Sequence, residues 1–183
     1  MKNLTLIGLL LMSISCSLNK NEVIVETHKN DINGISYVNM RNFQEDPYEI
    51  DFDVNQINKD EYSMLITMNL DEGVYYFSPN TNPKYGYSGV FKITLEPNPN
   101  LLMQDSLIET PKSYEYRDSI YGGPANFVKE NTTYEQKFKV LTENDFDVKG
   151  LVQFTIEPKC TYEEIVFVLS NKSGKLSVKH SKK

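Results

Sequence analysis

The sequence predicts an all-β protein, an antiparallel β-sandwich, and three observations favour this class. Short apolar runs rich in β-branched and aromatic residues recur along the chain with period-2 alternation, which is the pattern of half-buried strands. Turn-forming residues separate these runs, as at Asn33-Gly34 and at Asp71-Glu72-Gly73; such residues favour tight connections. No helical period persists beyond a few turns. Short strands with this spacing are typical of two antiparallel sheets packed together.

The first residues predict export. Lys2 supplies a positive charge, a short apolar stretch follows, and small residues lead to Cys16, which is the organisation of a signal peptide over residues 1–15. Ser13, Ile14, Ser15 and Cys16 resemble the lipobox of bacterial lipoproteins, with Ser13 where leucine is more usual. The resemblance implies acylation of Cys16, a membrane anchor, and a polar tether over residues 16–22. The alternative is ordinary cleavage nearby, which would leave Cys16 as a thiol.

Residues 23–179 are predicted to form a single domain. Strands are expected at residues 23–25, 35–40, 49–54, 63–70, 74–78 and 89–96, and a second set at 134–141, 148–156, 165–169 and 176–178. Residues 98–131 are rich in Asn, Pro, Gly and Tyr; we interpret them as an irregular excursion with room for a short edge strand. Residues 180–183 are expected to form a solvated basic tail.

Composition excludes several partners. The formal net charge is −6, and removal of residues 1–15 with Lys2 makes it −7, so nucleic acid is not an expected partner. The two histidines, His28 and His180, lie near opposite ends of the chain, and neither a metal site nor any cofactor is expected.

Residues 51–55, with Asp51, Asp53 and Asn55, imitate half of a calcium loop, but the required glycine and glutamate are absent. They are predicted to be the solvent face of a strand.

Cys160 is the candidate thiol, since it is the one cysteine that remains if Cys16 is acylated. It follows the predicted strand at 148–156 and precedes the one at 165–169, so it is expected in their connection. Lys159 would favour the thiolate, whereas Glu163 and Glu164 would disfavour it. Packing of Cys160 as a small apolar side chain at the sandwich end is therefore favoured over mixed-disulfide chemistry.

The order of a Val148-Lys149-Gly150 lead-in, a strand, Cys160 and a further apolar strand resembles the amino-terminal periplasmic domain of the thiol:disulfide interchange protein DsbD, in its Bacteroidota-type form. Residues 62–79 and 134–141 resemble other strands of that family, so the resemblance spans residues 62–170. It implies an immunoglobulin-like sandwich. The family exchanges electrons through two nearby cysteines, the second followed by proline, and residues 161–170 contain neither. Only Cys160 corresponds to the pair, so reductase chemistry does not follow.

Aromatic residues mark a second candidate site. Tyr75, Tyr76, Phe77, Tyr85 and Tyr87 flank the loop at residues 79–83. Tyrosines clustered on loops at a sandwich end can form a binding surface, because each offers an apolar face and a hydroxyl. The alternative, that these tyrosines are half-buried structural residues, is favoured.

Two serines are candidate modification sites. Asp105-Ser106-Leu107 and Asp118-Ser119-Ile120 resemble the acceptor sequence of Bacteroidota protein O-glycosylation. Both fall in the expected excursion, where an exposed chain could accommodate a glycan.

These patterns predict a lipoprotein of the cell envelope that acts as a non-catalytic binding or docking module, with its catalytic status open. The first alternative is a redox accessory in which Cys160 forms a mixed disulfide with an exported thiol oxidoreductase. The second is a surface lipoprotein that binds glycans. A membrane contacted through Cys16 and an envelope protein are the expected partners.

Overall fold

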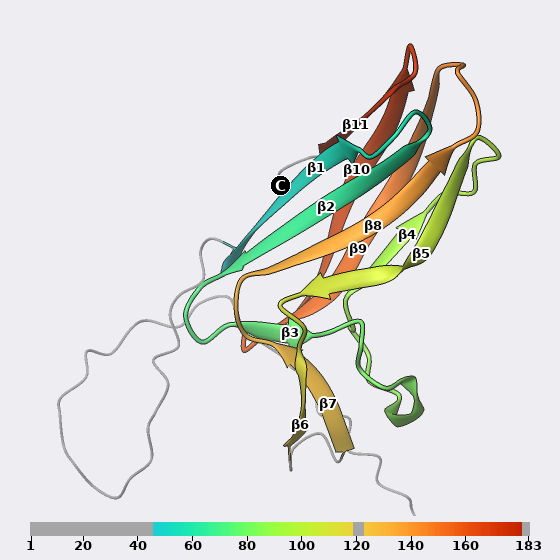
Figure 1. Ribbon diagram of the computed structural model, residues 1–183. Helices are drawn as coiled ribbons and strands as arrows, with labels where there is room; N and C mark the ends of the chain where they lie inside the picture. Colours follow the sequence, from blue (N-terminus) through green and yellow to red (C-terminus); the bar gives the residue numbers. More distant parts are fainter. Residues whose placement is uncertain (1–45, 119–122, 181–183) are drawn as a thin grey trace, which may run out of the picture. The chain divides into compact units, whose positions relative to one another are not determined.

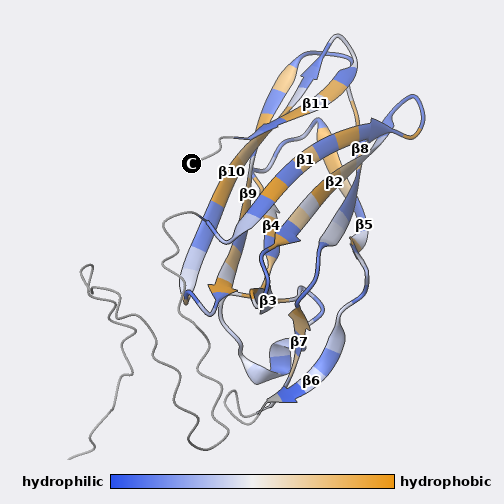
Figure 2. Cartoon of the chain, turned by 90° about the vertical axis from the view of Figure 1, so that its left-hand side faces the viewer, coloured by the Kyte–Doolittle hydropathy of each residue, from blue (hydrophilic) through white to orange (hydrophobic). Residues whose placement is uncertain are grey.

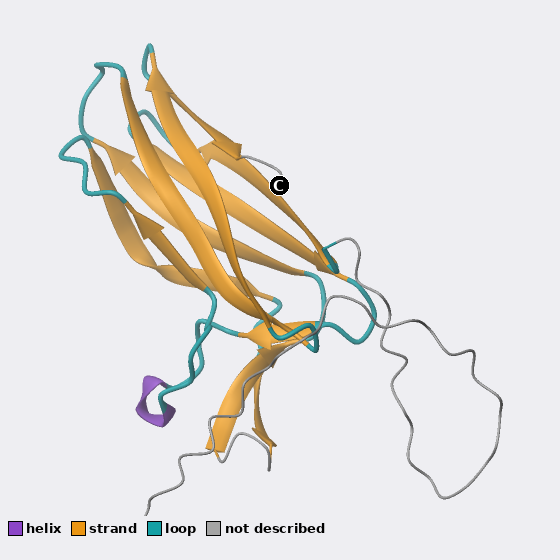
Figure 3. Cartoon of the chain, turned by 180° about the vertical axis from the view of Figure 1, so that it is seen from behind, coloured by secondary structure: helices purple, strands orange, loops and turns teal. Residues whose placement is uncertain are grey.

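The computed structural model describes residues 46–118 and 123–180. The predicted signal peptide, Cys16, the tether, the strands at 23–25 and 35–40, Ser119 and residues 181–183 lie outside the described residues. Within them the chain is an immunoglobulin-like antiparallel β-sandwich of two sheets (Figure 1), as the sequence predicts. Figure 3 shows one helical segment in this part of the chain, the single turn η1 (Pro83–Tyr85).

Sheet A has four antiparallel strands in the order β1-β2-β8-β5. Their bounds are β1 (Tyr48–Gln56), β2 (Glu61–Leu70), β8 (Thr132–Val140) and β5 (Leu101–Thr110). The exposed residues of β1 include Asp51, Asp53 and Asn55, which confirms that this acidic run is the solvent face of a strand.

Sheet B has seven strands, six of them in the order β11-β10-β9-β3-β7-β6, and the remaining strand, β4, pairs with β9. Their bounds are β3 (Tyr75–Phe77), β4 (Lys92–Leu95), β6 (Tyr114–Asp118), β7 (Gly123–Val128), β9 (Phe146–Glu157), β10 (Thr161–Lys172) and β11 (Lys175–His180). His180, predicted to open the basic tail, is therefore the last residue of β11. The strand at 165–169 is correctly predicted but extends further at both ends.

The core lies between the facing sheets and is filled by alternate side chains. Strand β8 alternates strictly between buried and half-buried residues, and hydrophobic and hydrophilic residues alternate along the strands (Figure 2). The rings of Phe91 and Tyr134 stack with centroids 4.0 Å apart, and Tyr76 packs against both rings. Offset aromatic contacts of this kind add to the free energy gained by burial.

The expectation of an irregular excursion at residues 98–131 is wrong, because β5, β6 and β7 lie there, although the short edge strand that it allowed is present as β6. The period-2 pattern of β5 is not apparent in the sequence, because the register of β5 against β8 shifts between Gln104 and Ile108. Asp105 adopts a left-handed backbone at the shift, with φ of 55°. Such a β-bulge breaks the period-2 alternation on which strand prediction depends.

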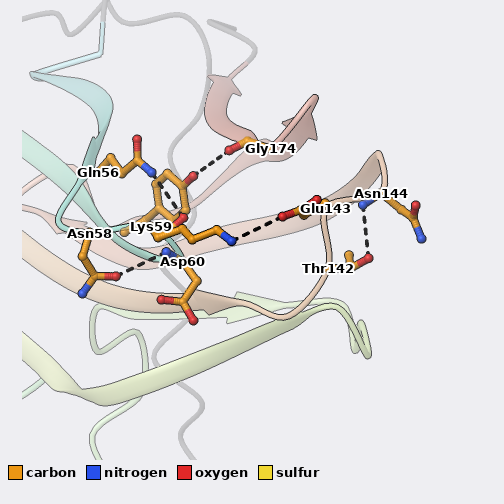
Figure 4. A network of polar contacts seen from close by, with 9 residues as sticks. Gln56, Asn58, Lys59, Asp60, Thr142, Glu143, Asn144 and Gly174 are labelled. Carbon is orange, nitrogen blue, oxygen red and sulfur yellow. Dashed lines mark hydrogen bonds and ion pairs between the residues drawn. The ribbon is translucent and has the colours of Figure 1, made fainter.

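Polar loops meet at the end of the sandwich where β1 joins β2 and β8 joins β9 (Figure 4). Lys59 and Glu143 form an ion pair of 3.5 Å there, and Tyr62 donates a hydrogen bond of 2.9 Å to the carbonyl of Gly174. Both charged side chains of the pair are almost fully exposed. Ion pairs of this kind contribute little to stability.

Candidate binding surface

The β6–β7 hairpin, called the wing from here on, extends away from the strands of sheet A (Figures 1 and 3). It consists of residues 114–118 and 123–128, and β3 joins it to the rest of sheet B. Tyr114 lies opposite Phe127, and Tyr116 lies opposite Ala125. Because directly opposite residues share a face of a sheet, these four side chains lie on one face of the wing.

A second hydrophobic cluster forms on this face. Phe77, Ala125 and Phe127 are its buried members, and Tyr75, Tyr87 and Val90 pack against them. The rings of Phe77 and Phe127 lie 5.0 Å apart, and Tyr87 stacks on Phe77 at 5.2 Å. The loop that contains η1 therefore covers the joint between β3 and β7.

Three aromatic rings surround the ammonium group of Lys129. Its Nζ lies 5.0 Å from the ring centroid of Tyr116, 5.4 Å from that of Phe127 and 5.7 Å from that of Tyr75. Each distance is within the range of a cation–π interaction. These rings are called the cage below. The cage comes from three strands of sheet B and holds one positive charge at the surface.

A cavity of about 220 Å³ opens beside the wing. Its wall includes the aromatic residues Tyr114, Tyr116 and Phe127 and the charged residues Glu115, Lys129 and Glu130. Tyr114 is 83% exposed and Tyr116 is 54% exposed. Large aromatic side chains this exposed, next to a concave and partly charged wall, are features of surfaces that bind other molecules.

A buried carboxylate fixes the base of the wing. Glu109 is 7% exposed, and its Oε2 accepts hydrogen bonds from Ser78 Oγ at 3.0 Å, Asn80 Nδ2 at 2.7 Å and both the backbone N and Oγ of Ser113 at 3.0 and 2.7 Å. Its Oε1 accepts one from the Tyr134 hydroxyl at 3.1 Å. Donors from the segment after β3 and from Ser113, just before β6, thus converge on one side chain.

The tyrosine next to that carboxylate belongs to a buried pair. The hydroxyls of Tyr76 and Tyr134 lie 2.9 Å apart. Burial raises the pKa of Tyr134 far above its ordinary value, and the neighbouring Tyr76 and the charge of Glu109 add to the rise. Burial likewise raises the pKa of Tyr76, although its hydrogen bond with Tyr134 opposes the rise. Both hydroxyls therefore stay protonated at neutral pH.

The structure divides the five predicted aromatic residues between two faces. Tyr75, Phe77, Tyr85 and Tyr87 gather over the wing joint, whereas Tyr76 points into the main core and is fully buried. Tyr76 therefore cannot belong to a binding surface, and Phe77 is also buried under the η1 loop. Neighbours on a strand face opposite sides, so three consecutive residues of β3 could not share one surface.

Sequence reasoning missed Phe127, Lys129 and Glu109. A short signal was present, because the apolar residues Ala125 and Phe127 lie on either side of the polar Asn126, which is a strand pattern. Tyr114 and Tyr116 alternate in the same way. The two glycines at 122 and 123 suggested a loop instead.

Cys160 lies in the β9–β10 turn, as the sequence predicts, but the expectation that it packs in the sandwich end is wrong, because its side chain is exposed. Its φ of 55° is left-handed, which turns the chain between the paired residues Ile156 and Thr161. Burial raises the pKa of Glu157, and a hydrogen bond from the backbone of Cys160 partly opposes this.

The charges near Cys160 are engaged locally. Lys159 Nζ lies 3.3 Å from the carboxylate of Asp46. Glu163 is buried and accepts a hydrogen bond from the Tyr48 hydroxyl at 3.2 Å, and Glu164 accepts one from Gln153. Burial, followed by the charge of Glu163, raises the pKa of Tyr48.

Ser106, one of the two candidate glycosylation sites, is exposed on β5 beside the bulge at Asp105. Its accessibility is compatible with modification, which stays a prediction. Among residues 46–118 and 123–180, no group of three or more His, Cys, Asp or Glu side chains could hold a metal ion. No helix in the same residues has the length and apolar character needed to cross a bilayer.

No known protein family and no curated protein matches the sequence. Among solved structures, the fold is similar to the reduced amino-terminal domain of DsbD from Neisseria meningitidis, with 11% identity, a TM-score of 0.46, and coverage of 72% of this chain and 90% of that one. It is also similar to the GAE domain of GGA2p from Saccharomyces cerevisiae, with 14% identity, a TM-score of 0.39, and coverage of 71% and 94%. Likenesses this distant concern the fold alone.

Proposed function

We propose that this protein is a cell-envelope lipoprotein whose β-sandwich is a non-catalytic docking module, with the wing as its docking surface. The observation that carries the docking role is the exposure of Tyr114 and Tyr116 beside the cavity. The envelope location rests on the predicted signal peptide and on the lipobox-like sequence that ends at Cys16.

The wing has the physical properties of a preformed surface. Tyrosine offers a large apolar area with little conformational freedom to lose on binding. The five hydrogen bonds to Glu109 and the rings packed around Phe127 hold the base of the wing in place. A surface that is ordered before binding loses less entropy when a partner docks.

Cross-linking in intact cells tests this proposal. Cells would carry the tagged full-length protein as wild type, as the Tyr114→Ser/Tyr116→Ser double variant, or as Tyr162→Ser. Tyr162 is a matched control, because it is 54% exposed, as is Tyr116, but lies on β10. We expect a cross-linked adduct that the wing variant loses and the control retains. An adduct of equal intensity in all three strains would refute the wing as the docking surface.

A second candidate function has its own observation, the exposure of Cys160 in the β9–β10 turn. In this function the Cys160 thiolate attacks a disulfide of an exported oxidoreductase. A mixed disulfide forms, and the second sulfur of the partner leaves as a thiolate. Cys160 is exposed in this turn, so its sulfur can be reached by a large partner.

Acid quenching of living cells, alkylation of thiols and non-reducing electrophoresis separate the two functions. A reducible adduct that is lost in Cys160→Ser but kept in the wing double variant would establish redox docking and displace the first proposal. A single band without an adduct in both strains, with Cys160 alkylated in wild type, would eliminate the mixed-disulfide role.

A further inference from the structure

We infer that the docking partner is an extended polypeptide segment bearing lysine, which adds to the edge of β6 and places its ammonium group in the cage formed by Tyr75, Tyr116 and Phe127. The inference rests on the docking function proposed above and names the chemistry of the partner. Three features of the described residues lead to it, namely the cage, the charge of the adjoining cavity and the position of β6.

The cage already holds an ammonium group, that of Lys129, at 5.0 to 5.7 Å from three ring centroids. The faces of aromatic rings attract cations because their quadrupole places negative charge there. Lys129 is exposed, and it takes part in none of the ion pairs formed by the described residues. The long side chain of Lys129 can therefore leave the cage and give its place to a second ammonium group.

The cavity beside the cage favours a cation over an anion. Three exposed charged residues line it, Glu115, Glu130 and Lys129, so two carboxylates stand against the one ammonium group that already occupies the cage. The chain as a whole carries a formal charge of −6. A basic segment would be attracted to this wall and would meet the rings on arrival, whereas an acidic segment would be repelled by the two glutamates.

The position of β6 supplies the backbone part of the site. It is the terminal strand of sheet B and pairs with β7 alone among the described strands, so its outer edge can accept another strand. Alternate side chains of an added strand would lie on the same face as Tyr114 and Tyr116. The edge of β5 is less suitable, because the bulge at Asp105 interrupts its regular pairing.

Lys129 then acts as a built-in competitor. Replacement with methionine keeps a flexible apolar side chain but removes the charge, so an incoming lysine would no longer compete with a resident ammonium. We expect Lys129→Met to bind a lysine-bearing strand more tightly than wild type, whereas a purely structural role for Lys129 predicts equal or weaker binding.

The test uses the full-length chain purified in detergent and a short, capped, fluorescent peptide of alternating valine and lysine. Matched probes are the same peptide with glutamate in place of lysine, and N-acetyl-lysine methylamide, which carries the ammonium without a strand. Fluorescence anisotropy measures the affinity of the labelled peptides, and competition measures the affinity of the small amine. Hydrogen exchange detected by mass spectrometry reports whether the amides of residues 114–118 become protected.

We expect the lysine peptide to bind and to protect the β6 amides, and the glutamate peptide to do neither. Tyr116→Ser should weaken binding by about five- to tenfold, the range expected when a partly desolvated cation–π contact is lost. Tyr162→Ser should leave the affinity within about twofold, since exposed residues away from the site change little. Lys129→Met should tighten it.

Four results would overturn the inference. Equal binding of the lysine and glutamate peptides would show that the site does not require a cation. Equal affinity for N-acetyl-lysine methylamide and for the lysine peptide would show that no added strand contributes to binding. Protection of β6 that depends on protein concentration without peptide would assign the edge to a second copy of the chain. Absence of any binding would exclude a lysine-bearing segment, while the docking function itself would still be decided by the cross-linking experiment.

Discussion

Replacement of Glu109 with alanine should destabilise the sandwich by about 4 kcal/mol and loosen the wing. The carboxylate accepts five hydrogen bonds, four at Oε2 and one at Oε1. Alanine removes both acceptors at once. The donors on Asn80 and Ser113 are only part-buried, so water can replace the carboxylate for them.

Two donors have no such replacement, because Ser78 and Tyr134 are 0% exposed. Without the carboxylate, the Tyr134 hydroxyl can donate its hydrogen to Tyr76 instead. The two hydroxyls together carry two hydrogens, however, and the bond between them uses only one. One hydrogen is therefore left without an acceptor in any arrangement. A buried donor without a partner costs about 1–3 kcal/mol, so two of them cost about 2–6 kcal/mol, and 4 kcal/mol is the middle of that range.

Urea denaturation followed by circular dichroism measures the loss, and hydrogen exchange at residues 114–118 measures the loosening. Glu109→Gln should lose less, about 1–2 kcal/mol, because it keeps one oxygen for the buried donors. Glu164→Ala is the matched control, since Glu164 is exposed and accepts a single bond from Gln153. If Glu109→Ala and Glu164→Ala lose the same amount, within about 1 kcal/mol, the carboxylate does not organise the base of the wing.

Three further predictions concern stability. Burial raises the pKa of Tyr134, so as the pH rises the hydroxyl ionises in the unfolded chain before the folded one, and its stabilising effect is present below about pH 10 and lost above it. The difference in free energy of unfolding between wild type and Tyr134→Phe, measured by urea titration, should therefore shrink by about 1.4 kcal/mol per pH unit above pH 10. A constant difference would contradict the burial of this hydroxyl. A Cβ at Gly150 would lie 2.1 Å from the ring of Phe167, so Gly150→Ala should lower the free energy of unfolding by about 1–3 kcal/mol. In a double-mutant cycle, Phe167→Leu should restore part of that loss. Strictly additive losses would show that the two residues do not clash. Cys160→Ser should change the free energy of unfolding by less than about 0.5 kcal/mol, because Cys160 is exposed, and a larger loss in the same assay would mean that the sulfur packs against the fold.

Local patterns in the sequence were sufficient for the fold class and for much of sheet B. Residues 148–156 alternate in apolar character with period 2, and they fall within β9, whose burial alternates in the same way. Glu157-Pro158 ends that pattern, so Cys160 could be placed in a turn without knowledge of its neighbours. Period and turn chemistry are properties of adjacent residues, and adjacent residues are what a sequence displays directly.

The strands between residues 98 and 131 could not be found in this way. The bulge at Asp105 interrupts the regular pairing of β5 with β8, and the strand is recognisable only beside β8, which supplies its hydrogen bonds. The alternation in β3 predicts that Tyr76 faces away from Tyr75 and Phe77, but it does not say which face meets the core. The core-facing side of β3 is set by sheet A, which packs against only one face of sheet B.

Patterns of neighbouring residues are enough to predict an antiparallel β-sandwich, a turn at Cys160 and an exported, acylated chain. Which residues meet at the wing depends on tertiary packing. The cage joins Tyr75 of β3, Tyr116 of β6 and Phe127 of β7 around Lys129, and Glu109 accepts hydrogen bonds from three separate segments. Strand order and register bring these residues together, and both depend on how whole faces pack, which local pattern does not specify.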